Sequence, residues 1–445
     1  MEFPALLLGL GEIGYTALTF IVALSIIVAV HEYGHYIVGR WSGIHAEVFS
    51  IGFGPRLWSR QDRRGTRWQV AAIPFGGYVK FLGDANAASA GADEETMERL
   101  SNEERRHTMH GAPLWARAAT VFAGPLFNFI LSVAVFAGMM LVSGVATEQP
   151  KIEALRDLPV AHDLRAGDTI LAIDGHETPG YAELRAAADD LPAQTLYDYS
   201  VLRDGTEQVV KGPSPMPPLI LGVLPKSAAM DAGLREGDVI VAVDGQPTPR
   251  FLDLQSAVRN SGGRGLALTV WRDGEQIAAT LTPRERPIQS EEGGFDTGYQ
   301  IGISSGFMFE PATRRPGVIE ALSNGASATY GVVEGTFSAI GSIFAGRIST
   351  CNINGPVGMA QAAGAAATAG VMSFVALVAA LSTAIGLINL FPIPILDGGH
   401  LVFHAYEWAF GKPPSDRFMN GAMAVGLALV LSLMVFGLTN DLFCK

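Results

Sequence analysis

The residues best suited to catalysis lie in an H-E-x-x-H motif that runs from His31 to His35. On a helix, two histidines four residues apart present both imidazoles on one face and can bind one metal ion. Glu32, beside the first histidine, could take the proton of a water activated at that metal. Such a match also arises by chance, but here it closes an uncharged run, residues 13–30, of mostly apolar side chains. Ionisable groups in hydrocarbon are costly and normally functional, so the motif predicts zinc protease chemistry.

A catalytic zinc site has a third protein ligand, with water at the fourth position. The best candidate is Asp397, the only acid near the end of a long run, residues 348–396, that contains no charged residue and no histidine. Two prolines before Asp397 would interrupt the helix, and two glycines after it would permit a sharp turn, so its carboxylate could reach the metal. Asn389 could donate a hydrogen bond to a substrate carbonyl or to the oxyanion.

His400 and His404 form a second pair of histidines at the same spacing. No acid stands beside His400 as Glu32 stands beside His31, and both residues follow the apolar run, where a histidine needs no metal. We therefore expect this second pair to have no metal role.

The elements that must position these residues are predicted to cross a membrane. Hydrophobic residues make up 49% of the 445 residues and charged residues only 17%. A span needs about 20 apolar residues. Four stretches qualify, namely 13–39, 118–147, 371–390 and 418–440. The small-residue stretch 354–370 is expected to be a loop or a poorly inserted helix.

The distribution of Lys and Arg predicts the orientation of the spans, because short cytoplasmic loops are enriched in both. Neither residue precedes the first span, whereas six arginines follow it between Arg40 and Arg67. That side should be cytoplasmic, which places both termini and the segment 148–350 outside the cytoplasm. The net charge of −12 argues against nucleic acid as a partner.

Between the first two spans, residues 47–81 are typical of short strands, with a turn near Gly65 and a glycine-rich end at Gly76 and Gly77. An open strand edge is tolerated at membrane depth only where it lines a cavity. Beside the zinc helix, such an edge could take an extended peptide as a further strand. The alternative is a small cytoplasmic hairpin with no such role.

The second span contains Gly124 and Asn128 at a spacing that places both on one helix face. Gly124 would let another helix pack closely, and Asn128 could hydrogen-bond across that interface. Packing alone is a sufficient explanation of this pair.

The outer segment contains an internal repeat, since residues 164–175 match residues 234–245 at an offset of 70. Each copy reads as a strand that ends in an Asp-Gly turn, and a helical stretch follows at 181–190 and 251–260. The pattern resembles PDZ domains, which take peptides by strand addition. The second copy is closer to the PDZ pattern than the first. The alternative is that both copies are spacers that restrict access by size.

Together the motifs resemble the site-2 protease family of intramembrane zinc metalloproteases. The resemblance rests on H-E-Y-G-H in the first span, G-P-L-F-N in the second and N-L-F-P-I-P-I-L-D-G in the third. The tandem repeat narrows it to the regulator of sigma-E protease (RseP) group. The resemblance implies zinc ligation by His31, His35 and Asp397, with Glu32 as the catalytic acid/base. Residues implied to handle the substrate are Asn128, Asn389, Gly76 and Gly77.

The resemblance also implies the substrate and the location. The enzyme would cut within the transmembrane segment of a single-span protein, such as an anti-sigma factor already trimmed outside the membrane, or a remnant signal peptide. It would lie in the bacterial inner membrane, with the PDZ-like domains and both termini in the periplasm, where the second domain could bind peptide C-termini. The irregular first repeat departs from the family pattern, as does Asn354, where a serine is usual. Cys351 and Cys444 would share the oxidising side, where a disulfide could form.

We expect a multi-pass α-helical membrane protein with a membrane-reentrant β segment and two extracytoplasmic PDZ-like α+β domains. The expected parts are the first transmembrane helix (1–46), the reentrant β segment and cytoplasmic linker (47–113), the second transmembrane helix (114–147), PDZ-like domain 1 (148–214), PDZ-like domain 2 (215–285), a connector with an amphipathic outer helix over 318–344 (286–350), the third transmembrane helix (351–400), and a cytoplasmic loop with the fourth transmembrane helix and C-terminus (401–445).

Two functions from other classes would also account for part of the sequence. A metal transporter is one, because intramembrane His, Glu and Asp also suit ion pathways. It does not explain the repeat or the acid at position 32. An inactive scaffold that binds peptides through the PDZ-like domains is the other. The intact set of His31, Glu32, His35 and Asp397 argues against it.

Overall fold

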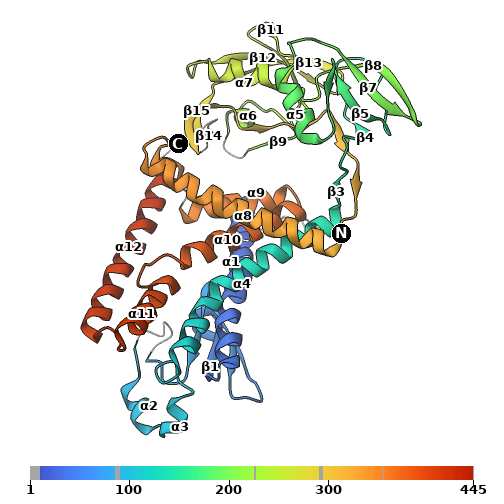
Figure 1. Ribbon diagram of the computed structural model, residues 1–445. Coiled ribbons are helices and arrows are strands. Elements are labelled where there is room, and N and C mark those ends of the chain that lie inside the picture. Colours follow the sequence, from blue (N-terminus) through green and yellow to red (C-terminus); the bar gives the residue numbers. More distant parts are fainter. Residues whose placement is uncertain (1–10, 86–90, 225–226, 290–293, 354, 444–445) are drawn as a thin grey trace. The chain divides into compact units, whose positions relative to one another are not determined.

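The computed structural model describes residues 11–85, 91–224, 227–289, 294–353 and 355–443 (Figure 1). Within the described residues the chain forms two compact units. The first unit draws on residues 1–139, 318–337 and 353–445, and the second on residues 140–317 and 338–352. Cys444, and with it the predicted pairing of the two cysteines, lies outside the described residues, as do the outermost residues of both termini.

Four helices of the described chain are long and apolar enough to cross a membrane, as predicted. They are α1 (Gly11–Trp41), α4 (Leu114–Ser143), α10 (Val371–Asn389) and α12 (Asp416–Phe443). Many of their apolar side chains are exposed, for example Leu433 and Val435 of α12 at 54% and 57%. Exposed apolar surface on this scale is unfavourable in water and expected in lipid, so the chain is a membrane protein.

Helices α4 and α10 are joined by buried serines. The Ser132 hydroxyl donates to the Ala379 carbonyl at 2.7 Å, and the Ser382 hydroxyl donates to the Asn128 carbonyl at 3.0 Å. Gly386 lies where an added Cβ would be 3.1 Å from the Pro125 carbonyl oxygen. Small and hydroxyl-bearing residues at such a contact are typical of packed membrane helices.

The stretch expected to be a loop or a poorly inserted helix contains helix α9 (Pro356–Thr368), which packs against α1, α10 and α12. The Asp441 carboxylate of α12 accepts three backbone N–H groups at the start of α9, at 3.0, 3.0 and 3.1 Å. A carboxylate there satisfies unpaired donors and complements the helix dipole. This cap comes from a residue more than 70 positions away, so the local sequence does not reveal it.

The predicted hairpin after the first span is present as β1 (Ala46–Gln61) and β2 (Arg67–Phe81). Both strands bend, so that Phe49 lies between Trp68 and Val79, and the hairpin forms a curved sheet. The segment 77–81 forms one edge of this sheet within the described residues. Its inner face packs on the second half of α1 and the start of α4, around a core of Tyr36, Ile44, Ala46, Phe49, Val79, Phe81, Ala112 and Ala116. Two short helices follow, α2 (Glu94–Arg99) and α3 (Asn102–Arg105).

Helix α11 (Asp397–Phe410) begins at the predicted third ligand and ends at Gly411, which has a φ of +72°. The preceding turn folds closely over its first residues. A Cβ at Gly398 would lie 2.2 Å from the Phe391 carbonyl oxygen, and a Cβ at Gly399 would lie 2.4 Å from that of Ile393. The two glycines are therefore needed because backbone approaches backbone there.

The second unit contains two four-stranded antiparallel sheets of identical strand order, β6-β5-β7-β8 and β11-β10-β12-β13. The strands of the first sheet are β5 (Thr169–Ile173), β6 (His176–Glu177), β7 (Tyr197–Arg203) and β8 (Thr206–Gly212), with helix α5 (Tyr181–Asp190). Those of the second are β10 (Val239–Val243), β11 (Gln246–Pro247), β12 (Leu266–Arg272) and β13 (Glu275–Leu281), with helices α6 (Ala228–Asp231) and α7 (Phe251–Arg259). The predicted internal repeat is thus a structural repeat.

The two repeats are nested in the chain. Near the start of the first repeat, β4 (Ile152–Leu155) pairs with the late strand β17 (Phe309–Pro311). In the second, β9 (Gly222–Val223) pairs with β16 (Ile303–Ser304). We define the first module as residues 145–214 with 305–314, and the second module as residues 215–304. Further strands are β3 (Val145–Ala146), β14 (Arg284–Gln289), β15 (Phe295–Gln300) and β18 (Thr313–Arg314), and the chain continues into α8 (Val318–Phe344), a helix over the range predicted.

Candidate metal centre

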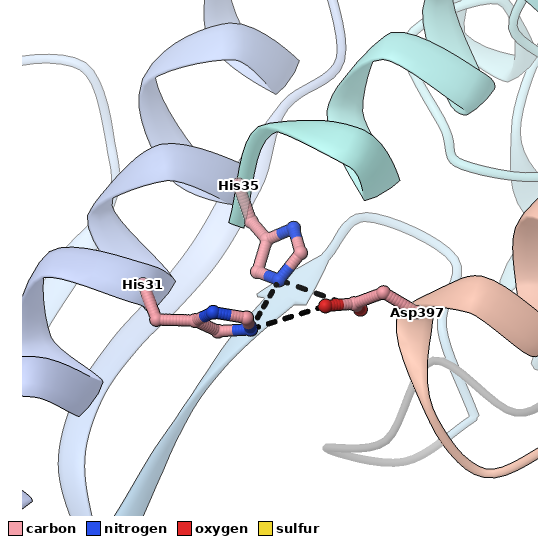
Figure 2. A group of neighbouring side chains, drawn as sticks. All are labelled: His31, His35 and Asp397. Carbon is pink, nitrogen blue, oxygen red and sulfur yellow. Dashed lines mark hydrogen bonds and ion pairs between the residues drawn. The ribbon is translucent and has the colours of Figure 1, made fainter. Parts of the chain in front are cut away.

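Three predicted ligands converge from two helices (Figure 2). His31 and His35 lie one turn apart on α1, and their Nε2 atoms are 3.1 Å apart. Asp397, the first residue of α11, places Oδ2 at 3.1 Å from His31 Nε2 and Oδ1 at 3.6 Å from His35 Nε2. In the described part of the chain, this is the one group of His, Cys, Asp and Glu side chains arranged to hold a metal ion.

The spacing of these atoms fits a zinc ion. Zinc binds imidazole nitrogen and carboxylate oxygen at about 2.0–2.2 Å in tetrahedral geometry, which separates two ligand atoms by about 3.3 Å. The three separations of 3.1, 3.1 and 3.6 Å lie close to that value. Two nitrogens and one oxygen also leave a fourth position for water, as in catalytic zinc sites.

Gly124 of α4 provides the space for the imidazoles. A Cβ at this position would lie 2.3 Å from His35 Nε2 and 2.8 Å from His31 Nε2. Any side chain would therefore overlap the atoms that face the metal position. The sequence predicts that Gly124 lets another helix pack closely, and the groups that approach it are the two histidine side chains of α1.

The same helix orients both histidines. His35 Nδ1 lies 2.8 Å from the Thr120 carbonyl oxygen, to which it can donate a hydrogen bond, and His31 Nδ1 lies 3.2 Å from the Asn128 amide. An imidazole that binds metal through Nε2 carries its proton on Nδ1 and needs an acceptor there. The amide of Asn128 would present its oxygen to His31 in that state, since the two ends of an amide are interchangeable by rotation. Thr120 acts through its backbone, and no side-chain pattern could have revealed it.

Glu32 lies on α1 next to the edge segment of β2. A Cβ at Gly77 would come within 3.2 Å of Glu32 Cγ, and the Val79 backbone hydrogen-bonds to the Glu32 carboxylate. Gly76 has a φ of +123°, and a Cβ there would lie 2.5 Å from the Phe53 ring. Gly77 thus lets the sheet edge approach the glutamate closely, and Gly76 makes room for the Phe53 ring within the sheet.

The other predicted residues lie on α10 and α11. Asn389 ends α10 and makes no side-chain hydrogen bond within the described residues. His400 and His404 are on α11, and burial lowers the pKa of His404 to about 4, with the positive charge of Arg117 as the next cause. Arg117 itself pairs with Glu407 in two hydrogen bonds of 2.9 and 2.7 Å. No local sequence pattern indicates that pair, because its members are 290 positions apart.

Comparison with known proteins identifies a family over most of the chain. The family model described as peptidase family M50 matches residues 19–433. An Agrobacterium fabrum protein named "Putative zinc metalloprotease Atu1380" is 36% identical over 431 residues, which cover 95% of this chain and 94% of that protein. The regulator of sigma-E protease RseP of Escherichia coli is 32% identical over 455 residues, covering 95% of this chain and 97% of the relative.

Proposed function

The chain belongs to peptidase family M50, the site-2 protease family, and is an intramembrane zinc metalloprotease; on that premise we propose that His31, His35 and Asp397 hold the zinc and that Glu32 is its acid/base. The observation that carries this assignment is the convergence of three ligand atoms from α1 and α11 at separations of 3.1 to 3.6 Å.

Glu32 acts as the proton carrier of the reaction. Zinc, when bound, polarises the scissile carbonyl and lowers the pKa of a water to about 7. Glu32 takes the proton of the attacking water and passes it to the leaving nitrogen. Asn128 and the Thr120 carbonyl hold the two imidazoles in the tautomer that ligation needs. Asn389 donates a hydrogen bond to the substrate carbonyl or to the oxyanion.

The edge segment of β2 holds the substrate. A helical peptide bond is shielded by its own hydrogen bonds, so the substrate must unwind before it is cut. Residues 77–81 offer an edge next to Glu32, where an extended chain can add as a further strand and satisfy its backbone at membrane depth. Gly76 and Gly77, at the start of this edge, are the residues that we propose handle the substrate there. We therefore take β1 and β2 to be a membrane-reentrant segment.

The substrates are single-span membrane proteins. The Escherichia coli relative is named a regulator of sigma-E protease, and this supports an anti-sigma factor, cut first outside the membrane, as the substrate type. Remnant signal peptides are a second class. The relative and the four apolar helices support a bacterial inner-membrane location, and the arginines after α1 support periplasmic modules and termini.

The two modules are PDZ-like, and the second one binds peptide C-termini. A cavity of about 120 Å³ lies between α7 and residues 299–303, lined by Leu254, Val258, Arg259 and Ile301 among others. Apolar side chains with one nearby guanidinium suit an apolar C-terminal residue with its carboxylate. In the first module, the Phe307 ring lies 5.8 Å from the Tyr181 ring and 5.9 Å from the Arg185 guanidinium, both on helix α5. That module is a spacer that helps to exclude untrimmed substrates by size.

Substitution of the acid and of the third ligand tests the assignment. Glu32→Gln should retain zinc and lose cleavage by about a hundredfold or more, because only the proton carrier is removed. Asp397→Asn should lower both zinc content and cleavage, because a ligand is weakened. Zinc content and cleavage of a single-span peptide would be measured on the full chain in detergent. Full activity of the Glu32 variant would rule out this acid/base.

Peptide binding has its own test. Arg259→Glu should weaken binding of a labelled peptide with an apolar C-terminal residue by about tenfold, whereas the matched change Arg185→Glu in the first module should not. Fluorescence anisotropy on the full chain would measure both. Equal binding of a C-terminally amidated peptide would contradict recognition of a carboxylate.

A further inference from the structure

Helix α4 contacts both histidine side chains that α1 contributes to the metal centre. Thr120 and Asn128 hold the Nδ1 atoms of the two histidines, and Gly124 between them clears the space in front of Nε2. These three residues are spaced four apart and lie on one face of α4. The positions of both imidazoles are thus set relative to α4.

The third ligand is held differently. Asp397 is the first residue of α11 and follows a turn interrupted by two prolines, so the chain before it is not a continuous helix. Asp397 Oδ2 is buried, and apart from its approach to His31 it has no hydrogen-bond partner within the described residues. Besides the close packing of the preceding turn on Gly398 and Gly399, the carboxylate depends on the rest of α11 for its position.

One contact ties α11 to α4 with defined geometry. Arg117 Nη1 and Nη2 donate to Glu407 Oε2 and Oε1 at 2.9 and 2.7 Å, and Arg117 Nε donates to the Ala112 carbonyl oxygen at 3.0 Å. The two side chains are only 15% and 18% exposed. A paired, largely buried fork of this kind fixes orientation as well as distance, which a single charge contact does not.

The position of this contact couples it to the ligands at both ends. Arg117 lies three residues before Thr120 on α4, and Glu407 lies ten residues after Asp397 on α11. Ten residues of helix are a rod of about 15 Å, so a slide or rotation at Glu407 is transmitted to Asp397. A slide of one residue along the helix axis is about 1.5 Å, which is enough to remove an oxygen from a metal.

We propose that the Arg117–Glu407 pair is a positioning clamp that sets Asp397 against the two histidines, with α4 as the common reference for all three ligands. The proposal rests on the zinc role of Asp397 proposed above. Neither Arg117 nor Glu407 touches the metal or the substrate. They act through α11, so their substitution should weaken metal coordination more than it lowers folding stability.

Zinc affinity of the full chain in detergent, measured by competition with a chelator, tests the clamp. Glu407→Gln and Arg117→Gln should each raise the zinc Kd by about tenfold, the effect typical of outer partners of metal ligands. The charge reversal Arg117→Glu with Glu407→Arg should restore it to within about threefold. In the Co2+-substituted protein, the single variants should change the visible spectrum, which reports the coordination of the metal itself.

The control is another two-bond pair of an arginine with a carboxylate, in the other unit. Arg203 donates two hydrogen bonds of 2.7 Å to Asp168, also with both side chains largely buried. Arg203→Gln should lower the thermal stability of the chain and leave the zinc Kd and the cobalt spectrum unchanged. Where Arg117→Gln fails to fold, Arg117→Lys keeps the charge but not the fork, and should still raise the Kd.

The outcomes separate the clamp from the proposed function. An unchanged zinc Kd and cobalt spectrum in Glu407→Gln or Arg117→Lys would overturn the clamp, provided that Asp397→Asn raises the Kd. An unchanged Kd in Asp397→Asn would instead overturn the ligand assignment on which the clamp rests. A reversed pair that binds zinc no better than the single variants would also count against the clamp.

Discussion

The chain carries two pairs of histidines at the same helical spacing, and the structure gives them different surroundings. His31 and His35 face a carboxylate from another helix, and each Nδ1 has a partner on α4. His400 and His404 lie on α11 beyond that carboxylate, and within the described residues neither ring is hydrogen-bonded. The first pair thus has, besides its spacing, the third donor, the orienting partners and the free space that a zinc site needs, which supports our proposal that it binds the metal.

The largest effect should come from closing that space. Gly124→Ala would place a Cβ 2.3 Å from His35 Nε2, so the imidazoles must move and zinc binding should be lost entirely. Zinc content of the purified chain would measure this. Gly138→Ala is the matched control on the same helix, because a Cβ there meets no heavy atom of the described residues within 4 Å.

Normal zinc content in Gly124→Ala would mean that the two histidines are not the ligands that the clearance suggests. Gly138→Ala should keep normal zinc content and be slightly more stable, since alanine favours a helix. A loss of zinc in the control would show that α4 as a whole, and not position 124, is sensitive to substitution.

A smaller effect should follow from removing an orienting partner. Asn128→Ala leaves His31 free to rotate and should raise the zinc Kd by about 10- to 100-fold without abolishing binding. Chelator competition would measure the Kd. Leu126→Ala, at a partly exposed position of the same helix, should leave it unchanged. If Asn128→Ala bound zinc as tightly as the unchanged chain, the contact between the amide and His31 would have only a packing role.

The structure can be predicted from the sequence where neighbouring residues carry the pattern. The four apolar helices, the hairpin after α1 and the repeat at an offset of 70 were predicted from local pattern and are present. The sequence motifs also predict the three side chains that converge in the structure. The long apolar runs and the residue spacing in the motifs are strong signals because lipid tolerates few exceptions.

The structure cannot be predicted from the sequence where a contact joins residues that only the fold brings together. The Thr120 carbonyl acts through the backbone, and the clearance at Gly124 exists only once α1 packs on α4. The pairing of Arg117 with Glu407 and the cap on α9 by Asp441 join residues far apart in the chain. The return of residues 305–314 to the first module has the same cause. Contacts of this kind follow from topology, which local periodicity does not encode.

The smallest effect on zinc affinity should come from substitution in the second histidine pair. The expected change there is in folding stability. His404 lies outside the four candidate spans, faced by Arg117, His400 and Glu407, and burial lowers its pKa from the ordinary 6.5 to about 4. Between these values the unfolded chain binds a proton that the folded chain does not, so folding stability falls as the pH drops from about 6.5 toward 4, by up to about 3 kcal/mol.

His404→Gln should remove this part of the pH dependence and leave the zinc Kd unchanged. Thermal unfolding midpoints of both proteins across that pH range, with zinc binding at neutral pH, would measure it. A variant with the same pH slope as the unchanged chain would mean that His404 is not the group that titrates, and weaker zinc binding would mean that the two histidine pairs are not independent.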